Sequence, residues 1–190
     1  MFDVAVFRTG VRYGVMGALF GFAVLLGLYF TGNNPYGINR FYTFLFIPIF
    51  IFLGVRYYKK FVSGDLPFFK AFSVAFSISL YLALCSAMLL YILSVAAGYE
   101  AMQQFIDEMI AMQEANRTQM IETWGEELYN QNLEALKQTT PALLAFSDFM
   151  NKLFVGVICS LLAAVIFRKM TPKAARPEVV ENEEDNKNNI

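Results

Sequence analysis

Histidine is absent from the 190-residue chain, and cysteine occurs only twice. Without histidine, the sequence lacks the commonest general base, the commonest zinc ligand and the usual base partner of serine and cysteine nucleophiles. Two cysteines cannot build a disulfide framework or a four-ligand metal site, and Cys85 and Cys159 both lie inside apolar runs. We therefore expect no catalytic residue, no cofactor and no metal, and a protein that is not an enzyme.

Charged residues are also scarce, at 16% of the chain, whereas an average soluble domain has about 25%. Apolar residues make up 57% and aromatic residues 16%. This balance excludes a disordered chain, a nucleic-acid binder and an ordinary soluble enzyme domain. It is typical of a membrane protein, whose first partner is the lipid bilayer.

Four apolar runs are long enough to cross a hydrocarbon core, which needs about 20 mostly apolar residues. The predicted spans cover residues 11–30, 41–58, 69–97 and 143–169. Thr140 and Pro141 are typical of an N-cap and a first helical position, so the fourth helix is expected to begin there. Pro48, near the centre of the second span, is expected to kink it. The first run is longer than a signal peptide's apolar region, and we expect it to stay as an anchor.

Lysine and arginine are distributed unequally between the two sides of these spans. One side holds Arg8, Arg12, Arg56, Lys59, Lys60, Lys70, Arg168, Lys169, Lys173 and Arg176. The other side holds Arg40, Arg117, Lys137 and Lys152. Because basic residues favour the cytoplasmic ends of membrane helices, both termini are predicted to be cytoplasmic. The polar, acid-rich residues 171–190 are expected to form a disordered cytoplasmic tail.

The segment between the third and fourth spans, residues 98–140, is then extracytoplasmic and rich in acids. An apolar stripe at helical spacing consists of Met102, Phe105, Ile106 and Met109. Gly125 interrupts the segment, so we predict a helical hairpin. An amphipathic helix needs its apolar side covered. We expect this stripe to form a partner surface or to pack on the second helix, around Leu128, Leu133 and Leu136.

Small residues recur at helical spacing in three of the spans. They are Gly10, Gly14, Gly17 and Gly21 on the first span, Ala83 and Ala87 on the third, and Gly156 and Ser160 on the fourth. Small residues let membrane helices approach closely, since van der Waals contact replaces the absent hydrophobic drive. Two interpretations stay open, namely packing within one chain and a face for self-association.

Asp148 and Lys152 stand four residues apart at the outer end of the fourth span, so they share one helix face as a candidate ion pair. One interpretation is an interfacial pair that snorkels to water and sets the depth of the helix. The other is a ligand or ion site, because an ionisable residue within a membrane is a functional candidate by default.

The order of these parts and several short motifs resemble a known family. Arg56-Tyr57-Tyr58 is followed by Gly64 and then by Phe68-Phe69-Lys70-Ala71-Phe72, and residues 156–166 close on Arg168-Lys169. Over about residues 10–170 the chain resembles a group of small four-span membrane proteins of Bacteroidetes that is known only as a domain of unknown function. The resemblance implies a bacterial inner-membrane location and transfers no functional residue.

The sequence thus predicts an all-α, polytopic membrane protein with four transmembrane helices and an extracytoplasmic helical hairpin between the third and fourth. We expect a non-enzymatic structural or protein-interaction component that binds a protein partner or a second copy of itself, and no nucleic acid. The alternative is a small transporter or channel component. Its candidate polar groups are Ser73, Ser77, Ser79, Ser86 and Ser94 of the third span.

Overall fold

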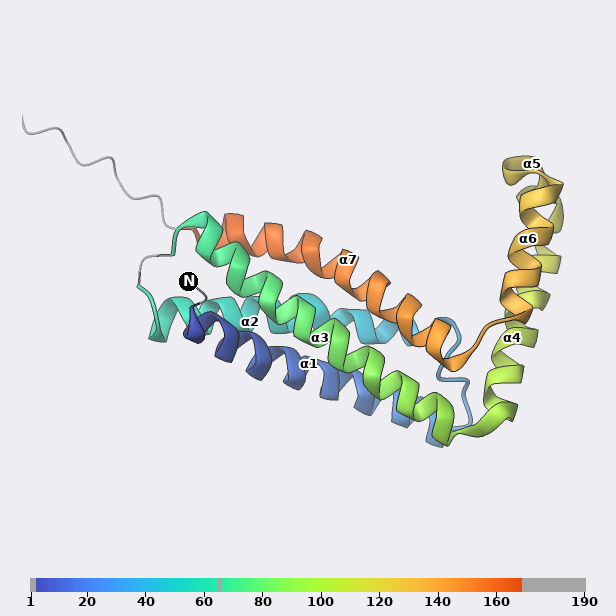
Figure 1. Ribbon diagram of the computed structural model, residues 1–190, viewed down its shortest axis with the longest axis horizontal. Helices are drawn as coiled ribbons and strands as arrows, with labels where there is room; N and C mark the ends of the chain where they lie inside the picture. The colour runs from blue at the N-terminus through green and yellow to red at the C-terminus, as the bar shows by residue number, and fades with distance from the viewer. Residues whose placement is uncertain (1–2, 65, 169–190) are drawn as a thin grey trace, which may run out of the picture.

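The computed structural model describes residues 3–64 and 66–168, and this part of the chain is all-helical. Four helices there are long and apolar enough to cross a membrane, over Val4–Phe30, Asn39–Phe61, Phe68–Ala96 and Pro141–Phe167. They confirm the four predicted spans and indicate a multi-pass membrane protein. Figure 1 shows them side by side, alternating in direction along the chain. The predicted tail, residues 171–190, lies outside the described residues.

Local capping explains where the first and last spans begin. Helix α1 (Val4–Phe30) starts before the predicted residue 11 because the Asp3 side chain accepts a hydrogen bond from the Ala5 N–H. Helix α7 (Pro141–Phe167) is capped in the same way by Thr140, whose hydroxyl oxygen accepts from the Leu143 N–H. Its first residue is the predicted proline. The third span is the single helix α3 (Phe68–Ala96).

The second span combines two kinds of helix. It begins as a 3-10 helix, η1 (Ile38–Leu45), and continues as α2 (Phe46–Phe61). Pro48 lies in the first turn of α2, shortly after the junction of the two. Proline is best tolerated in the first turn of an α-helix, and a kink at Pro48 stays a prediction.

The small residues lie where α1 and α7 pack on α3. A Cβ atom added to Gly14 would stand 2.8 Å from the Ile78 carbonyl oxygen and 2.9 Å from the Leu82 backbone nitrogen. Added Cβ atoms at Gly10 and Gly156 would meet Ser77 and Ser79, and one at Gly17 would meet Leu82 and Phe50. Ala83, Ala87 and Ser160 are buried, and Gly21 lies more loosely against Thr43. These residues occupy contacts within one chain, the first of the two interpretations.

Between α3 and α7 the chain forms three helices, α4 (Gly98–Ala115), α5 (Arg117–Trp124) and α6 (Glu126–Lys137). We call residues 98–137 the arm. Figure 1 shows that the arm crosses one end of the bundle and reaches beyond α7. The predicted two-helix hairpin missed the break between α4 and α5. Gly98 and Gly125, at the joints before α4 and α6, have φ values of 81° and 85°, a region that favours glycine.

The apolar stripe of the arm packs on the bundle, whereas the sequence predicted either a partner surface or packing on the second arm helix. Met102, Phe105 and Ile106 are buried in one cluster with Leu25, Tyr36, Leu90, Leu93 and Leu144, and Met109 lies partly buried against it. Leu128 is 51% exposed. The physical reason is connectivity, since α4 follows α3 almost directly and its first turns are held over the apolar ends of the spans.

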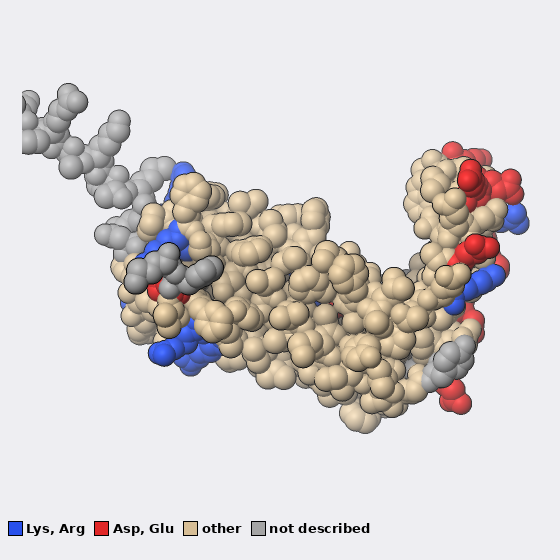
Figure 2. Space-filling model, in the orientation of Figure 1, with Lys and Arg blue, Asp and Glu red and all other residues tan. Residues whose placement is uncertain are grey.

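Charged side chains gather at the two ends of the molecule. Figure 2 shows lysine and arginine at the end of the bundle opposite the arm, and most aspartate and glutamate on the arm. Most of the arm's acids lie on the side turned away from the bundle in this view. The long surface between the two ends is almost free of visible charge, as expected for a surface that faces lipid.

Candidate functional site

Four polar side chains meet inside the bundle, near the end that carries the arm. They are Arg40 on η1, Ser86 on α3, and Asp148 and Lys152 on α7, and we call them the buried charge cluster. The side chains of Asp148 and Lys152 are 0% and 2% exposed, and that of Arg40 is 16% exposed. Charged groups buried to this degree in an apolar bundle are costly, so the cluster is the first candidate for a functional site.

Asp148 is the centre of the cluster, because both cations pair with it. Its Oδ2 atom lies 2.8 Å from the Lys152 Nζ and accepts a hydrogen bond from the Ser86 hydroxyl at 3.5 Å. Lys152 also donates to the Ser86 oxygen, which closes a triangle across the α3–α7 contact. The Arg40 Nε stands 3.8 Å from the other carboxylate oxygen, Oδ1.

Local structure explains why these groups converge. Asp148 and Lys152 share one face of α7, because residues four apart lie one above the other on a helix. Small neighbours, Ala87 on α3 and Ala145 on α7, are buried beside them and let the two helices approach. Arg40 is held by η1, where the Thr43 hydroxyl donates to the Arg40 carbonyl oxygen at 2.9 Å.

The burial of the pair corrects the prediction that it snorkels to water. Asp148 and Lys152 lie about 10 Å and about 17 Å along α7 from its start, at about 1.5 Å per residue. Their side chains point into the bundle and are sealed from solvent, so Lys152 does not snorkel to water. Its Nζ lies 5.7 Å from the centre of the Phe44 ring, a cation–π distance.

Arg40 is the member of the cluster that sequence reasoning missed. It was counted only as one of the basic residues on the outer side. Nothing in its spacing relates it to Asp148, more than a hundred residues later in the chain. The link needs the 3-10 geometry of η1, which brings the start of the second span against α7.

Two polar atoms of the cluster are buried without a hydrogen-bond partner, the Arg40 Nη1 and the Asp148 Oδ1. A buried polar group without a partner costs about 1–3 kcal/mol, and more if it is charged. Both atoms lie at the contact between Arg40 and Asp148, where the 3.8 Å ion pair is too long to be a hydrogen bond.

Away from the arm, the cluster is followed by a short polar stretch and then by an apolar core. The Ser160 hydroxyl donates to the Gly156 carbonyl oxygen at 2.6 Å, so it satisfies itself within α7. Farther along, the bundle is filled by a core cluster that includes Ile51, Val55 and Ala163, all 0% exposed. This apolar core lies between the buried charge cluster and the end of the bundle opposite the arm.

The segment between α1 and η1 joins the arm to the cluster. Asn34 donates a hydrogen bond from its side-chain amide to Glu108 of α4 at 3.1 Å. The Tyr36 and Phe105 rings meet edge to face with centroids 6.3 Å apart. Burial in this contact raises the pKa of the Tyr36 phenol. A few residues later the same segment supplies Arg40.

The opposite end of the bundle holds a more exposed polar group. Asp3 accepts a hydrogen bond from the Tyr58 hydroxyl at 3.0 Å and pairs with Lys70 at 3.3 Å. The Ala5 N–H, and after it Tyr58, holds the pKa of the Asp3 carboxyl below its ordinary value. This group fixes the start of α1 against α2 and α3, which is a structural role.

The cysteines and acids of the described residues do not form a further candidate site. Cys85 and Cys159 are free thiols, each half-buried in its span. Within residues 3–64 and 66–168, no group of three or more cysteine, aspartate and glutamate side chains is placed to hold a metal ion.

Comparison with known proteins identifies a family and nothing finer. No curated protein and no solved structure matches the chain. A family described as "Protein of unknown function (DUF4199)" matches residues 12–169, which include most of the first span, the other three spans, the arm and the buried charge cluster. This match confirms the resemblance to a family of unknown function, and the chain belongs to the DUF4199 family.

Proposed function

We propose that the chain is a non-enzymatic protein of the bacterial inner membrane that presents its acidic arm to a partner protein on the extracytoplasmic side. The bundle serves as the anchor. The buried stripe of α4 fixes the arm across the end of the bundle, and the rest of the arm extends past α7. A held arm with an exposed far end is the feature that most favours an interaction role.

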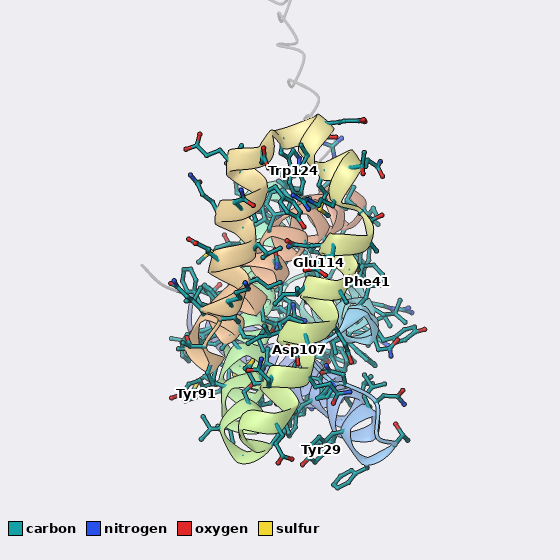
Figure 3. All side chains as sticks on the ribbon, turned by 90° about the vertical axis from the view of Figure 1, so that its right-hand side faces the viewer. Tyr29, Phe41, Tyr91, Asp107, Glu114 and Trp124 are labelled. Carbon is teal, nitrogen blue, oxygen red and sulfur yellow. The ribbon has the colours of Figure 1, made fainter. Side chains whose placement is uncertain are left out.

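The observation that carries this proposal is the exposed surface near the joint of α5 and α6. Trp124 is 49% exposed and Leu128 is 51% exposed. Figure 3 places Asp107, Glu114 and Trp124 along the arm, with Trp124 toward its far end. Tryptophan is enriched among residues that dominate binding energy in protein interfaces. The flanking acids Glu122 and Glu126 are exposed and favour a partner with basic residues around an apolar pocket.

The distribution of charge supports the orientation. The basic side chains of Arg8, Arg56, Lys60 and Arg168 belong to the end opposite the arm, where α1 begins and α7 ends. By the positive-inside rule this end faces the cytoplasm, and the arm faces the other side. Both termini are then cytoplasmic.

Site-directed cysteine labelling tests the orientation. In a Cys85→Ala, Cys159→Ala background, Glu114→Cys and Lys60→Cys each receive a membrane-impermeant maleimide on intact cells. We expect labelling at Glu114 without permeabilisation and at Lys60 only after it. Labelling of both from the same side, or the reverse pattern, would contradict the orientation.

Photo-crosslinking in native membranes tests the interaction. A photoreactive residue at Trp124 should give a discrete protein adduct that disappears when Glu122 and Glu126 are both changed to Lys. The same residue at Phe154, which is 70% exposed on the lipid-facing side of α7, is the matched control and should label lipid. An adduct with a second copy of the chain would identify self-association. Adducts with lipid alone at both positions would refute the proposal.

A small transporter or channel component is the second candidate, and the buried charge cluster is the observation that favours it. Ionisable residues inside membrane bundles mark many substrate and ion pathways. The apolar core beyond Ser160 stands against a continuous path, since Ile51, Val55 and Ala163 fill the opposite half. Flux of ions across liposomes that contain the purified protein tests this candidate. Flux that is abolished by Asp148→Asn would favour it over the interaction role.

A further inference from the structure

The charges of the buried cluster do not balance. Arg40 and Lys152 contribute two positive charges, and the single carboxylate of Asp148 pairs with both. Glu108, an acid of the arm, is exposed and accepts a hydrogen bond from Asn34. With all three groups ionised, the cluster carries a formal charge of +1. An excess charge in a low-dielectric interior is unfavourable unless an opposite charge accompanies it.

The cluster also has a donor to which such an opposite charge could bond. The Arg40 Nη1 is buried with no hydrogen-bond partner and is a donor of the guanidinium that already touches Asp148. Arg40 lies at the arm side of the cluster with 16% of its side chain exposed, whereas Asp148 behind it is fully buried. An anion that enters from the arm side therefore meets a free, charged donor first.

We propose that the buried charge cluster is a binding site for one monovalent anion, a halide-sized ion or a single anionic group such as a lipid phosphate, held by the Arg40 guanidinium. One negative charge brings the cluster to neutrality. A divalent anion would overshoot by one unit, so sulfate should bind more weakly than chloride. The inference rests on the cluster alone and does not depend on the function of the arm.

The charge count gives a specific test, because each substitution changes it by one unit. Arg40→Gln and Lys152→Met bring the cluster to zero without an anion, whereas Asp148→Asn brings it to +2. The anion effect should therefore vanish in the first two variants and grow in the third. Arg8→Gln, an exposed arginine at the opposite end, is the control and should behave as the unmutated protein.

The experiment uses the full chain in phosphatidylcholine nanodiscs, and compares thermal unfolding in sodium chloride and sodium gluconate at equal ionic strength. Binding to the folded state raises the unfolding midpoint, because it stabilises that state by RT ln(1 + [L]/Kd). We expect a higher midpoint in chloride, and an apparent Kd for chloride at least about tenfold lower in Asp148→Asn. A further set of samples in gluconate contains phosphatidylglycerol in the nanodiscs. A rise there and not in chloride assigns the site to a lipid phosphate.

Chloride-35 NMR line broadening on the unmutated protein gives a second measurement that does not require any variant to fold. We expect excess broadening that bromide displaces and that Arg40→Gln removes. Equal midpoints in chloride, gluconate and phosphatidylglycerol, without excess broadening, would overturn the proposal. An anion response that survives in both Arg40→Gln and Lys152→Met would overturn it as well.

Discussion

Replacing Asp148 should destabilise the protein far more than replacing Lys152, although the two residues form one ion pair. Asp148→Leu removes the carboxylate that pairs with both cations and leaves Lys152, which is 2% exposed, buried without that partner. Removing one partner of a buried pair costs about 3–5 kcal/mol. Lys152→Met, in contrast, keeps the carboxylate paired with Arg40 and hydrogen-bonded by Ser86. Its cost should stay under about 2 kcal/mol, near the value of one charge-assisted hydrogen bond.

The double variant Asp148→Leu, Lys152→Met makes the argument sharper. It leaves only Arg40, whose side chain already reaches solvent and can turn toward it. The double variant should therefore be more stable than Asp148→Leu alone, with a coupling of about 1–3 kcal/mol between the two positions. If each substitution only removed packing contacts, the losses of stability in the two single variants would add up to the loss in the double variant.

Reversible unfolding by urea in micelles of a non-ionic detergent gives these free energies, in gluconate buffer so that no small monovalent inorganic anion compensates the charge. The transitions are followed by Trp124 fluorescence and by circular dichroism, and coincident curves support two-state treatment. If Asp148→Leu costs no more than Lys152→Met, or if the double variant is the least stable of the three, Asp148 does not bridge the two cations and the charge count is wrong.

Three further predictions concern the packing, the termini and the arm. Gly14→Leu should lower the free energy of unfolding by about 1–3 kcal/mol, because the larger side chain overpacks against the α3 backbone. Gly27→Ala has open space around it and should raise this free energy by about 0.5–1 kcal/mol. Unfolding in detergent compares the two variants. Because the pKa of Asp3 is lowered by folding, its contribution is present above about pH 4 and is lost as the pH falls through the lowered pKa. The acid destabilisation measured by pH titration of unfolding should therefore be smaller in Asp3→Asn. Phe105→Glu should release the arm, so hydrogen exchange over residues 98–137 should rise to the unprotected rate while the spans stay protected, and Leu128→Glu should leave it unchanged.

The number and length of the spans were predictable because they follow from bilayer thickness and local composition. An apolar run of about 20 residues has few alternatives to a membrane helix. The start of α7 was equally local, since Thr140 and Pro141 carry their own capping chemistry. The 3-10 geometry of η1 was not predictable in this way, because no periodicity distinguishes it from an α-helix over so few residues.

The buried charge cluster was half predictable. The spacing of Asp148 and Lys152 shows that they share a helix face, but it does not show which way that face points. The spacing of Asp148 and Lys152 is compatible with a face that points into the bundle and with one at the edge of the lipid. The direction is set by α3, whose small residues receive α7, and by Arg40, which approaches from a separate element. Long-range relations of this kind leave no trace in a single sequence.

The arm shows the same division between local and distant causes. Its helices and its apolar stripe were visible in the spacing of Met102, Phe105 and Ile106, yet the surface that covers them was assigned to the wrong partner. Tyr36 supplies part of the correct one, and the residues after it lead into η1 and Arg40. The contact that holds the arm and the contact that places a cation beside Asp148 are therefore made by one short segment. An arm that shifts on binding a partner must move this segment or break from it, and either outcome changes the surroundings of the buried charge.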